Sequence, residues 1–154
     1  MKIAFVILNY NTYEETRKNI LSIEDKLDTS DYRVVIVDNC STDDSAEKIL
    51  DFIKGREQIE FIKNPENLGF ARGNNVGMAY VNKNYNPEFV VVCNSDIELM
   101  QRNLVRRLDT EYRKSEFALL GPLVFSESGS YDTSPMIMPT VGQLKSEIKE
   151  LKKK

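Results

Sequence analysis

The sequence predicts an α/β protein, a three-layer sandwich in which helices cover both faces of a mostly parallel central sheet. Short apolar segments rich in β-branched residues alternate with helical patterns along the chain. The segment Phe89–Cys93 is typical of a strand that is buried on both faces, as strands of helix-covered parallel sheets are. The 154 residues, 41% hydrophobic and 29% charged, suit one globular domain of ordinary size.

The first two predicted strands are each followed by a helix with a capping-box start. Ile3–Leu8 is the first apolar run, and Thr12 with Glu15 has the spacing of a capping box. Tyr32–Val37 is the second strand. Ser41 repeats the capping-box spacing with the aspartate three positions later, so a second helix is expected to begin there.

A helix that contains two glycines follows the third predicted strand, Ile59–Ile62. The intervening segment 64–69 is rich in Asn, Pro and Gly, which predicts a loop. The helix is expected over 70–82. Gly73 and Gly77 weaken it by about 1 kcal/mol each, and we expect them to allow close packing against a neighbour or a ligand.

The remaining elements continue the alternation of strand and helix. The fourth strand is Phe89–Cys93, and an amphipathic helix over 101–115 and a fifth strand at Ala118–Phe125 follow it. Residues 126–139 have loop composition, and Thr140–Lys154 predicts a lysine-rich amphipathic helix. Right-handed crossovers between parallel strands favour the order 3-2-1-4 for the first four strands.

This strand order predicts which residues meet at one edge of the sheet. Ligands of open parallel sheets bind beyond the carboxyl ends of the strands, at the switch point. Three polar segments would meet there: Asn9-Tyr10-Asn11, Asp38-Asn39 and Asn94-Ser95-Asp96. Cys40 and Cys93 would lie on opposite sides of the first strand, too far apart for a disulfide, and two free thiols suit a reducing cytoplasm.

The chemistry of this edge favours a cation and a phosphate-bearing ligand. The first strand-to-helix turn contains no glycine, which excludes a dinucleotide fingerprint and a P-loop. A divalent cation held by Asp96 would supply the positive charge that a phosphate needs. Asp38 could accept a hydrogen bond from a ribose hydroxyl or a pyrimidine imide. Both aspartates could instead cap the helices that follow their strands.

Bulk properties exclude other classes of function. The net charge of −3 and the pI near 5.2 give no sign of nucleic-acid binding. No run of 18 apolar residues is present to span a membrane. The lysine-rich helix predicted at the end of the chain could make peripheral contact with an anionic membrane surface or form a solvated face.

Four segments resemble the nucleotide-sugar-binding half of family 2 glycosyltransferases, which have the Rossmann-like GT-A fold. They are Val6–Asn11, Val35–Asp43, Asn67–Gly77 and Val92–Asp96, and the third is the most diagnostic. The resemblance extends from Ile3 to Phe125, and the subgroup looks similar to rhamnosyltransferase-like members. It implies a nucleotide-sugar-binding GT-A domain over 1–135, followed by a linker and the amphipathic helix over 136–154.

The resemblance also implies the roles of individual residues. Asp96 is the last residue of a D-x-D-type motif and the implied ligand of Mn²⁺ or Mg²⁺. Asn94 stands where the family has the first aspartate, so Asp96 is the sole charged ligand. Arg72 is out of register with the family's arginine and receives no diphosphate role. The implied nucleotide-binding residues are Asn9, Tyr10, Asn11, Asp38, Asn39, Gly69, Asn75 and Asn94.

The implied activity is inverting, metal-dependent transfer of a sugar from a UDP- or dTDP-sugar donor to a glycan or lipid-linked acceptor. Such a reaction belongs to cell-wall or polysaccharide biosynthesis, in the cytoplasm or at the inner face of the membrane. The catalytic base is expected in an acceptor-binding half beyond Lys154, so none is assigned, and this chain is expected to be the donor-binding half. The alternative is a non-catalytic nucleotide-sugar-binding or interaction module.

Overall fold

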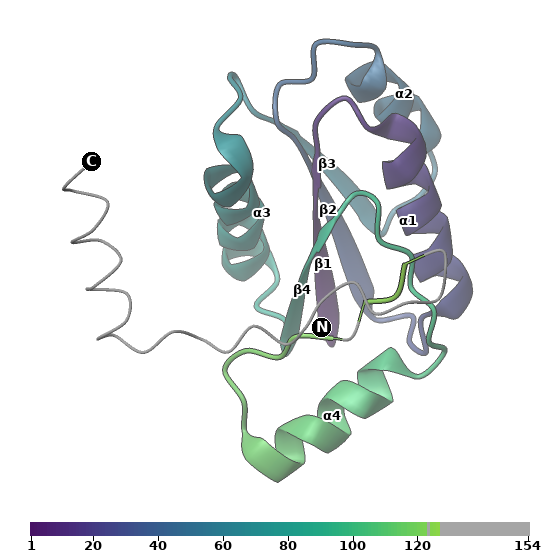
Figure 1. Cartoon of the computed structure of the whole chain (residues 1–154), viewed down its shortest axis with the longest axis vertical. Helices are drawn as coiled ribbons and strands as arrows, with labels where there is room; N and C mark the ends of the chain where they lie inside the picture. The colour runs from purple at the N-terminus through teal and green to yellow at the C-terminus, as the bar shows by residue number, and fades with distance from the viewer. Residues whose placement is uncertain (123, 127–154) are drawn as a thin grey trace, which may run out of the picture. The chain divides into compact units, whose positions relative to one another are not determined.

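The computed structural model describes residues 1–122 and 124–126, and residues 1–115 form one compact unit. Four parallel strands make up its sheet in the order β3-β2-β1-β4 (Figure 1). This is the predicted order. The strands are β1 (Ile3–Asn9), β2 (Tyr32–Asp38), β3 (Ile59–Lys63) and β4 (Phe89–Asn94). The helices are α1 (Tyr13–Lys26), α2 (Ser45–Phe52), α3 (Gly69–Asn84) and α4 (Leu104–Ser115).

The helices divide the core into two layers, one on each face of the sheet. Helices α1 and α2 lie together on one face and α3 lies on the other (Figure 1). Alternate residues of β1 therefore enter different clusters: Ile3, Phe5 and Ile7 pack with α1, α2 and α4, and Ala4 and Val6 pack with α3. All five are nearly inaccessible to solvent, which confirms helix cover on both faces of β1.

The glycines of α3 allow the helix to approach the sheet closely, as predicted. A β-carbon at Gly73 would lie 2.6 Å from Leu8 Cδ1, and one at Gly77 would clash with Val6 Cγ1 and lie 3.0 Å from Val37 Cγ2. Their described neighbours are therefore side chains of β1 and β2 and, for Gly73, also Asn39 Cγ at 3.4 Å.

The expectation that the fourth strand is buried on both faces is wrong for the described residues. β4 is an edge strand, and its residues alternate between half-buried and exposed. Val90 and Val92 pair with Ala4 and Val6 but remain 37% and 43% exposed. They lie on the α3 face, and α3 packs mainly over β1 and β2, so this part of β4 is left uncovered.

The predicted fifth strand at Ala118–Phe125 is also wrong. Residues 116–122 and 124–126 contain no strand, and Phe125 forms only an isolated bridge. Gly121 and Pro122 interrupt the apolar run, and proline has no N–H to donate to a sheet. The predicted loop at 126–139, apart from its first residue, and the predicted helix at 140–154 lie outside the described residues.

Neither predicted capping box forms. Thr12 is the N-cap residue of α1, but its side chain makes no capping hydrogen bond. Helix α2 begins at Ser45 with Asp44 as N-cap, not at Ser41, and the Asp44 side chain makes no capping hydrogen bond either. The hydroxyls of Thr12 and Ser41 bond instead to residues at the carboxyl edge of the sheet. None of the helices in the described residues has the length and apolar character needed to span a bilayer.

Candidate functional site

Three strand ends meet at the carboxyl edge of the sheet, as the strand order predicted. Asn9, the last residue of β1, is in register with Asp38, the last residue of β2. On the other side of β1, Leu8 is in register with Asn94, the last residue of β4. The turns that follow these strands therefore share one edge and can contact one ligand.

Asn9 is a fully buried hub of hydrogen bonds. Its Nδ2 donates to Asp38 Oδ1 at 2.8 Å and to Ser41 Oγ at 3.1 Å. Its Oδ1 accepts from the hydroxyls of Thr12 at 3.1 Å and Thr16 at 2.9 Å. Two donors and two acceptor positions are thus all used, and Asn9 joins β1 to β2 and to the first turn of α1.

Asp38 holds the turn that follows β2. It has no exposed surface, and its Oδ1 accepts from Ser41 Oγ at 2.5 Å in addition to Asn9. Its Oδ2 accepts from the backbone N–H of Ser41 at 3.0 Å. These bonds stabilise Cys40 in the left-handed region at φ 64°, where a side chain with a β-carbon is strained. Asp38 therefore caps its own turn and not α2.

Asn11 links the β1 and β2 turns to each other. It lies in the left-handed region at φ 57°, which asparagine tolerates well. Its Oδ1 accepts from the N–H of Thr42 at 2.8 Å, and its Nδ2 donates to Thr42 Oγ1 at 3.1 Å. Tyr10, between these fixed residues, is 41% exposed and forms an aromatic rim on the site.

A second polar cluster lies on the α3 face of the same edge. Asn39 Nδ2 donates to Asn67 Oδ1 at 2.7 Å, and Asn39 Oδ1 accepts from Asn64 Nδ2 at 3.1 Å and from Leu68 N at 3.0 Å. Gly69 follows at φ 74° and starts α3. The predicted residues Asn39 and Gly69 thus build the loop that brings α3 to the edge.

The two neighbouring asparagines of α3 differ in their surroundings. Asn75, which was predicted to bind nucleotide, is exposed on the helix surface. Asn74 is buried; its Nδ2 donates to Phe70 O at 3.1 Å, and its Oδ1 has no hydrogen-bond partner within residues 1–122 and 124–126. The structure therefore does not join Asn75 to the Asn9–Asp38 cluster by any described contact.

The end of β4 presents the Asn94-Ser95-Asp96 segment at the site. Asn94 and Asp96 are exposed, and the Asp96 carboxylate makes no ion pair or side-chain hydrogen bond with the described residues. Just before them, burial raises the pKa of the Cys93 thiol to about 11. Both cysteines are free: Cys93 lies in β4, and Cys40 lies in the turn after β2, on the other side of β1.

These residues fit a cation that keeps part of its water shell. The described residues contain no group of three or more His, Cys, Asp or Glu side chains that could enclose a metal. An exposed, unpaired carboxylate next to the neutral amide of Asn94 instead suits Mg²⁺ or Mn²⁺ bound through few protein ligands together with phosphate oxygens.

Several polar residues of this site were not predicted from the sequence. Thr16, Asn19 and Ser22 lie on the buried side of α1, next to the apolar positions Ile20 and Ile23. Polar residues at helical spacing within an otherwise apolar face are the signal that could have identified them.

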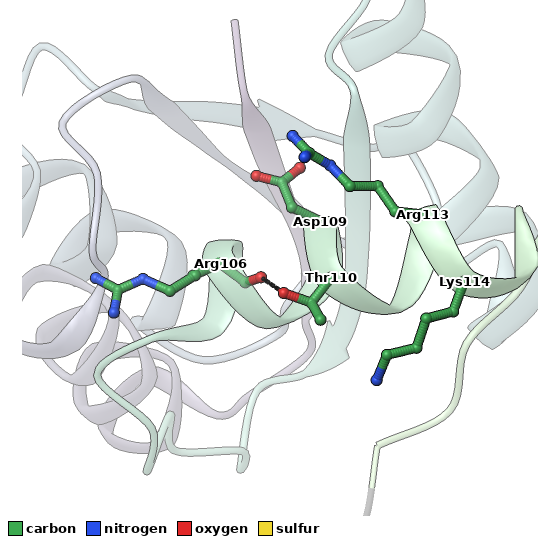
Figure 2. A pocket seen from close by; sticks show the side chains of 5 residues that line it. All are labelled: Arg106, Asp109, Thr110, Arg113 and Lys114. Carbon is green, nitrogen blue, oxygen red and sulfur yellow. Dashed lines mark hydrogen bonds between the residues drawn. The ribbon is translucent and has the colours of Figure 1, made fainter.

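A cavity of about 470 Å³ lies elsewhere, along α4. Arg106, Asp109, Thr110, Arg113 and Lys114 line it, all from that helix (Figure 2). Asp109 Oδ1 is 2.9 Å from Nζ of Lys2, the residue before β1. The cavity is therefore near the amino edge of the sheet, opposite the strand ends described above, and no predicted site residue lines it.

The chain resembles proteins of one kind in both sequence and structure. The family model described as "Glycosyl transferase family 2" matches residues 4–149. The low-salt glycan biosynthesis hexosyltransferase Agl10 of Haloferax volcanii is 27% identical over 127 residues, which cover 82% of this chain and 38% of that protein.

Two solved structures have a similar fold. TarS 1–349 of S. aureus, in complex with UDP-GlcNAc, matches with a TM-score of 0.61 and 21% identity over 75% of this chain and 32% of that chain. The mannosyltransferase PcManGT of Pyrobaculum calidifontis, in complex with GDP-Man and Mn²⁺, matches with a TM-score of 0.59 and 18% identity over 70% and 31%. The chain spans less than two fifths of the length of each of these relatives.

Proposed function

Because this chain belongs to glycosyltransferase family 2, we propose that it binds a nucleotide-sugar donor for transfer of the sugar to an acceptor hydroxyl. The observation that carries the proposal is the shared edge of β1, β2 and β4. There a buried polar network around Asn9 and Asp38 shares the edge with the carboxylate of Asp96, which makes no ion pair or hydrogen bond with the described residues. The fixed network suits the nucleoside, and the free carboxylate suits a cation on the diphosphate.

For the nucleoside, we propose UDP or dTDP as the carrier of the sugar. Asp38 Oδ2 accepts one hydrogen bond from protein, so it keeps an acceptor position for the imide N–H of a pyrimidine. Because Asp38 is fully buried, the turn at Cys40 and Ser41 must open slightly for the base to reach it. The exposed ring of Tyr10 can stack on the base. Asn11, Asn39, Gly69 and Asn75 are proposed to complete the nucleotide site.

For the diphosphate, we propose that Asp96 holds Mn²⁺ or Mg²⁺ with help from the Asn94 amide. The bound cation would offset the charge that develops on the departing nucleoside diphosphate. The residues of this chain would place the carboxylate, orient the nucleoside and keep the sugar at the carboxyl edge. The proposed reaction inverts the anomeric centre and uses a glycan or lipid-linked acceptor at the inner face of the membrane; no described residue is assigned as its base.

Removal of the Asp96 carboxylate is expected to abolish metal-dependent binding. With UDP as the probe, calorimetric titrations of the wild-type chain should show tighter binding when Mn²⁺ is present. Asp96→Ala should weaken UDP binding in Mn²⁺ about 100-fold, which corresponds to about 2.7 kcal/mol, and should change binding without metal little. Glu98→Ala, which removes a nearby exposed carboxylate, is the matched control and should bind as wild type. If Mn²⁺ strengthened UDP binding as much in the Asp96→Ala variant as in wild type, the assignment of Asp96 as the metal ligand would be wrong.

A second candidate is a nucleotide-sugar-binding module without transferase activity of its own. This candidate is worth testing because the chain spans less than two fifths of the length of these relatives. The two candidates differ in one assay, because only the first allows this chain to hydrolyse or transfer the sugar of a UDP-sugar in the presence of Mn²⁺.

A further inference from the structure

Helix α1 carries a row of polar side chains that bond to the segment following β4. Thr12 Oγ1 lies 3.1 Å from Ser95 Oγ, and Asn19 Nδ2 donates to the backbone oxygen of Asn94 at 2.9 Å. Ser22 Oγ accepts from the N–H of Leu99 at 2.8 Å. We call Thr12, Asn19 and Ser22 the α1 seam. Its bonds lie on both sides of Asp96 in the sequence.

Two of the three seam residues, Asn19 and Ser22, are buried, and Thr12 is partly buried. Asn19 and Ser22 are 2% and 6% exposed, and Ser22 Oγ also donates to Asn19 O at 2.7 Å. The bonds to Asn94 O and Leu99 N are partly buried, so loss of one of these side chains removes a partner that water replaces only in part. The seam therefore holds the backbone at Asn94 and Leu99 firmly.

Between those two residues the segment has few described contacts: Thr12 with Ser95, and a backbone hydrogen bond from Ile97 N to Asn94 O at 3.4 Å. Residues 95–103 form turns and irregular backbone without helix or strand, and Asp96 itself makes no side-chain bond with the described residues. Further on, Asp28 Oδ1 accepts from the N–H of Val105 at 2.9 Å, at the start of α4. The position of Asp96 thus depends on Asn19 and Ser22 of α1 and on Asp28, which follows α1. These residues hold the backbone before and after Asp96.

Helix α1 also fixes the nucleoside side of the site. Thr16 Oγ1 donates to Asn9 Oδ1 at 2.9 Å, and Thr12 Oγ1 contacts both Asn9 Oδ1 and Ser95 Oγ. One rigid helix therefore sets the distance between the Asn9–Asp38 network and the segment that carries Asp96. A cation bound at Asp96 could then meet a diphosphate whose nucleoside is already placed.

We propose that Asn19 and Ser22 are positioning residues that hold Asp96 ready for the cation on the donor diphosphate. The inference rests on the proposed function, because it assigns these buried residues a role in donor binding through Asp96. Ordering a free loop at the moment of binding would weaken affinity, and a loop that is already fixed avoids this loss.

A double-mutant cycle between Asn19 and Asp96 tests the proposal. UDP affinity is measured at saturating Mn²⁺ for wild type, Asn19→Ala, Asp96→Ala and the double variant. Asn19→Ala should weaken UDP binding about tenfold in the wild-type background and less than twofold in the Asp96→Ala background. Asn84→Ala, which removes an exposed asparagine of α3 whose side chain donates to Tyr80 O, is the matched control and should leave affinity unchanged.

Ser22→Ala provides a second variant if Asn19→Ala does not fold. Hydrogen exchange of the free protein supplies a readout without ligand, in which the Leu99 amide should exchange faster in Ser22→Ala while amides of β1 and β2 keep their protection. Ser22→Ala should also weaken UDP binding in Mn²⁺, again only when Asp96 is present.

The outcomes separate this inference from the proposed function. If Mn²⁺ does not raise the affinity of the wild-type chain for UDP, both the proposed function and the positioning role are contradicted. If that gain is present but Asn19→Ala and Ser22→Ala bind as wild type, or lose the same factor with and without Asp96, the positioning role alone is overturned.

Discussion

An Asn9→Leu variant is expected to lose about 4 kcal/mol of unfolding free energy. Leucine has the same branching and number of side-chain heavy atoms as asparagine but bulkier methyl groups, so no cavity forms and the loss arises mainly from hydrogen bonds. Asn9 is fully buried and bonds to Asp38, Ser41, Thr12 and Thr16. Its replacement removes a donor from the buried Asp38 carboxylate and an acceptor from two hydroxyls, and each unsatisfied buried group costs about 1–3 kcal/mol.

Urea denaturation of the two proteins measures this loss. The midpoint should fall at nearly constant slope, because the change affects the folded state. Asn75→Leu makes the same substitution at an exposed position of α3 and should alter the unfolding free energy by less than about 0.5 kcal/mol. A loss below about 1 kcal/mol for Asn9→Leu would show that the network contributes little to stability.

Gly77→Ala is expected to lose about 3 kcal/mol of unfolding free energy, although alanine favours helices. The added β-carbon would overlap Val6 Cγ1 and lie 3.0 Å from Val37 Cγ2. Val6 and Val37 are fully buried in β1 and β2, so neither can move away freely. Overpacking of this kind costs about 1–3 kcal/mol or more, which exceeds the gain of about 1 kcal/mol in helix propensity.

Gly121→Ala is the matched control for this substitution. Its β-carbon would meet no described residue within 4 Å, and its backbone is not in the left-handed region. It should leave the denaturation midpoint nearly unchanged. If Gly77→Ala were as stable as wild type, α3 would have to be able to move away from the sheet, and the close approach would not be a requirement of the fold.

The alternation of strand and helix was sufficient to predict the sheet order and the meeting of Asn9, Asp38 and Asn94 at one edge. Hydrophobic periodicity and the chirality of crossovers are properties that a single sequence carries. The exposed face of β4 could not be predicted in this way. An apolar run of Val90 to Val92 indicates a strand, but which helix covers it depends on where α3 packs.

Some side chains of the site could form either a helix-capping hydrogen bond or a bond to another part of the fold, and the sequence does not show which one forms. Thr12 has capping-box spacing with Glu15, yet its hydroxyl bonds to Asn9 and Ser95 because β4 brings Ser95 beside it. The sequence allows Asp38 to be a ligand residue or a helix cap. In the structure it caps its own turn through Ser41. The Thr12–Ser95 contact spans 83 positions, which local spacing does not reveal. The Asp38–Ser41 bonds span three positions, and local spacing alone does not decide between such a turn and a helix cap.

The central claim is that a cation binds at Asp96, between the ends of β1 and β4, when UDP is present. Paramagnetic broadening of amide signals by Mn²⁺ added with UDP tests it most directly. The strongest broadening should fall on residues 94–98, with weaker broadening at 9–12 and 38–42, and α4 at the opposite edge should remain sharp. Broadening that is strongest on the α4 cavity residues, or that is uniform over the chain, would contradict the account.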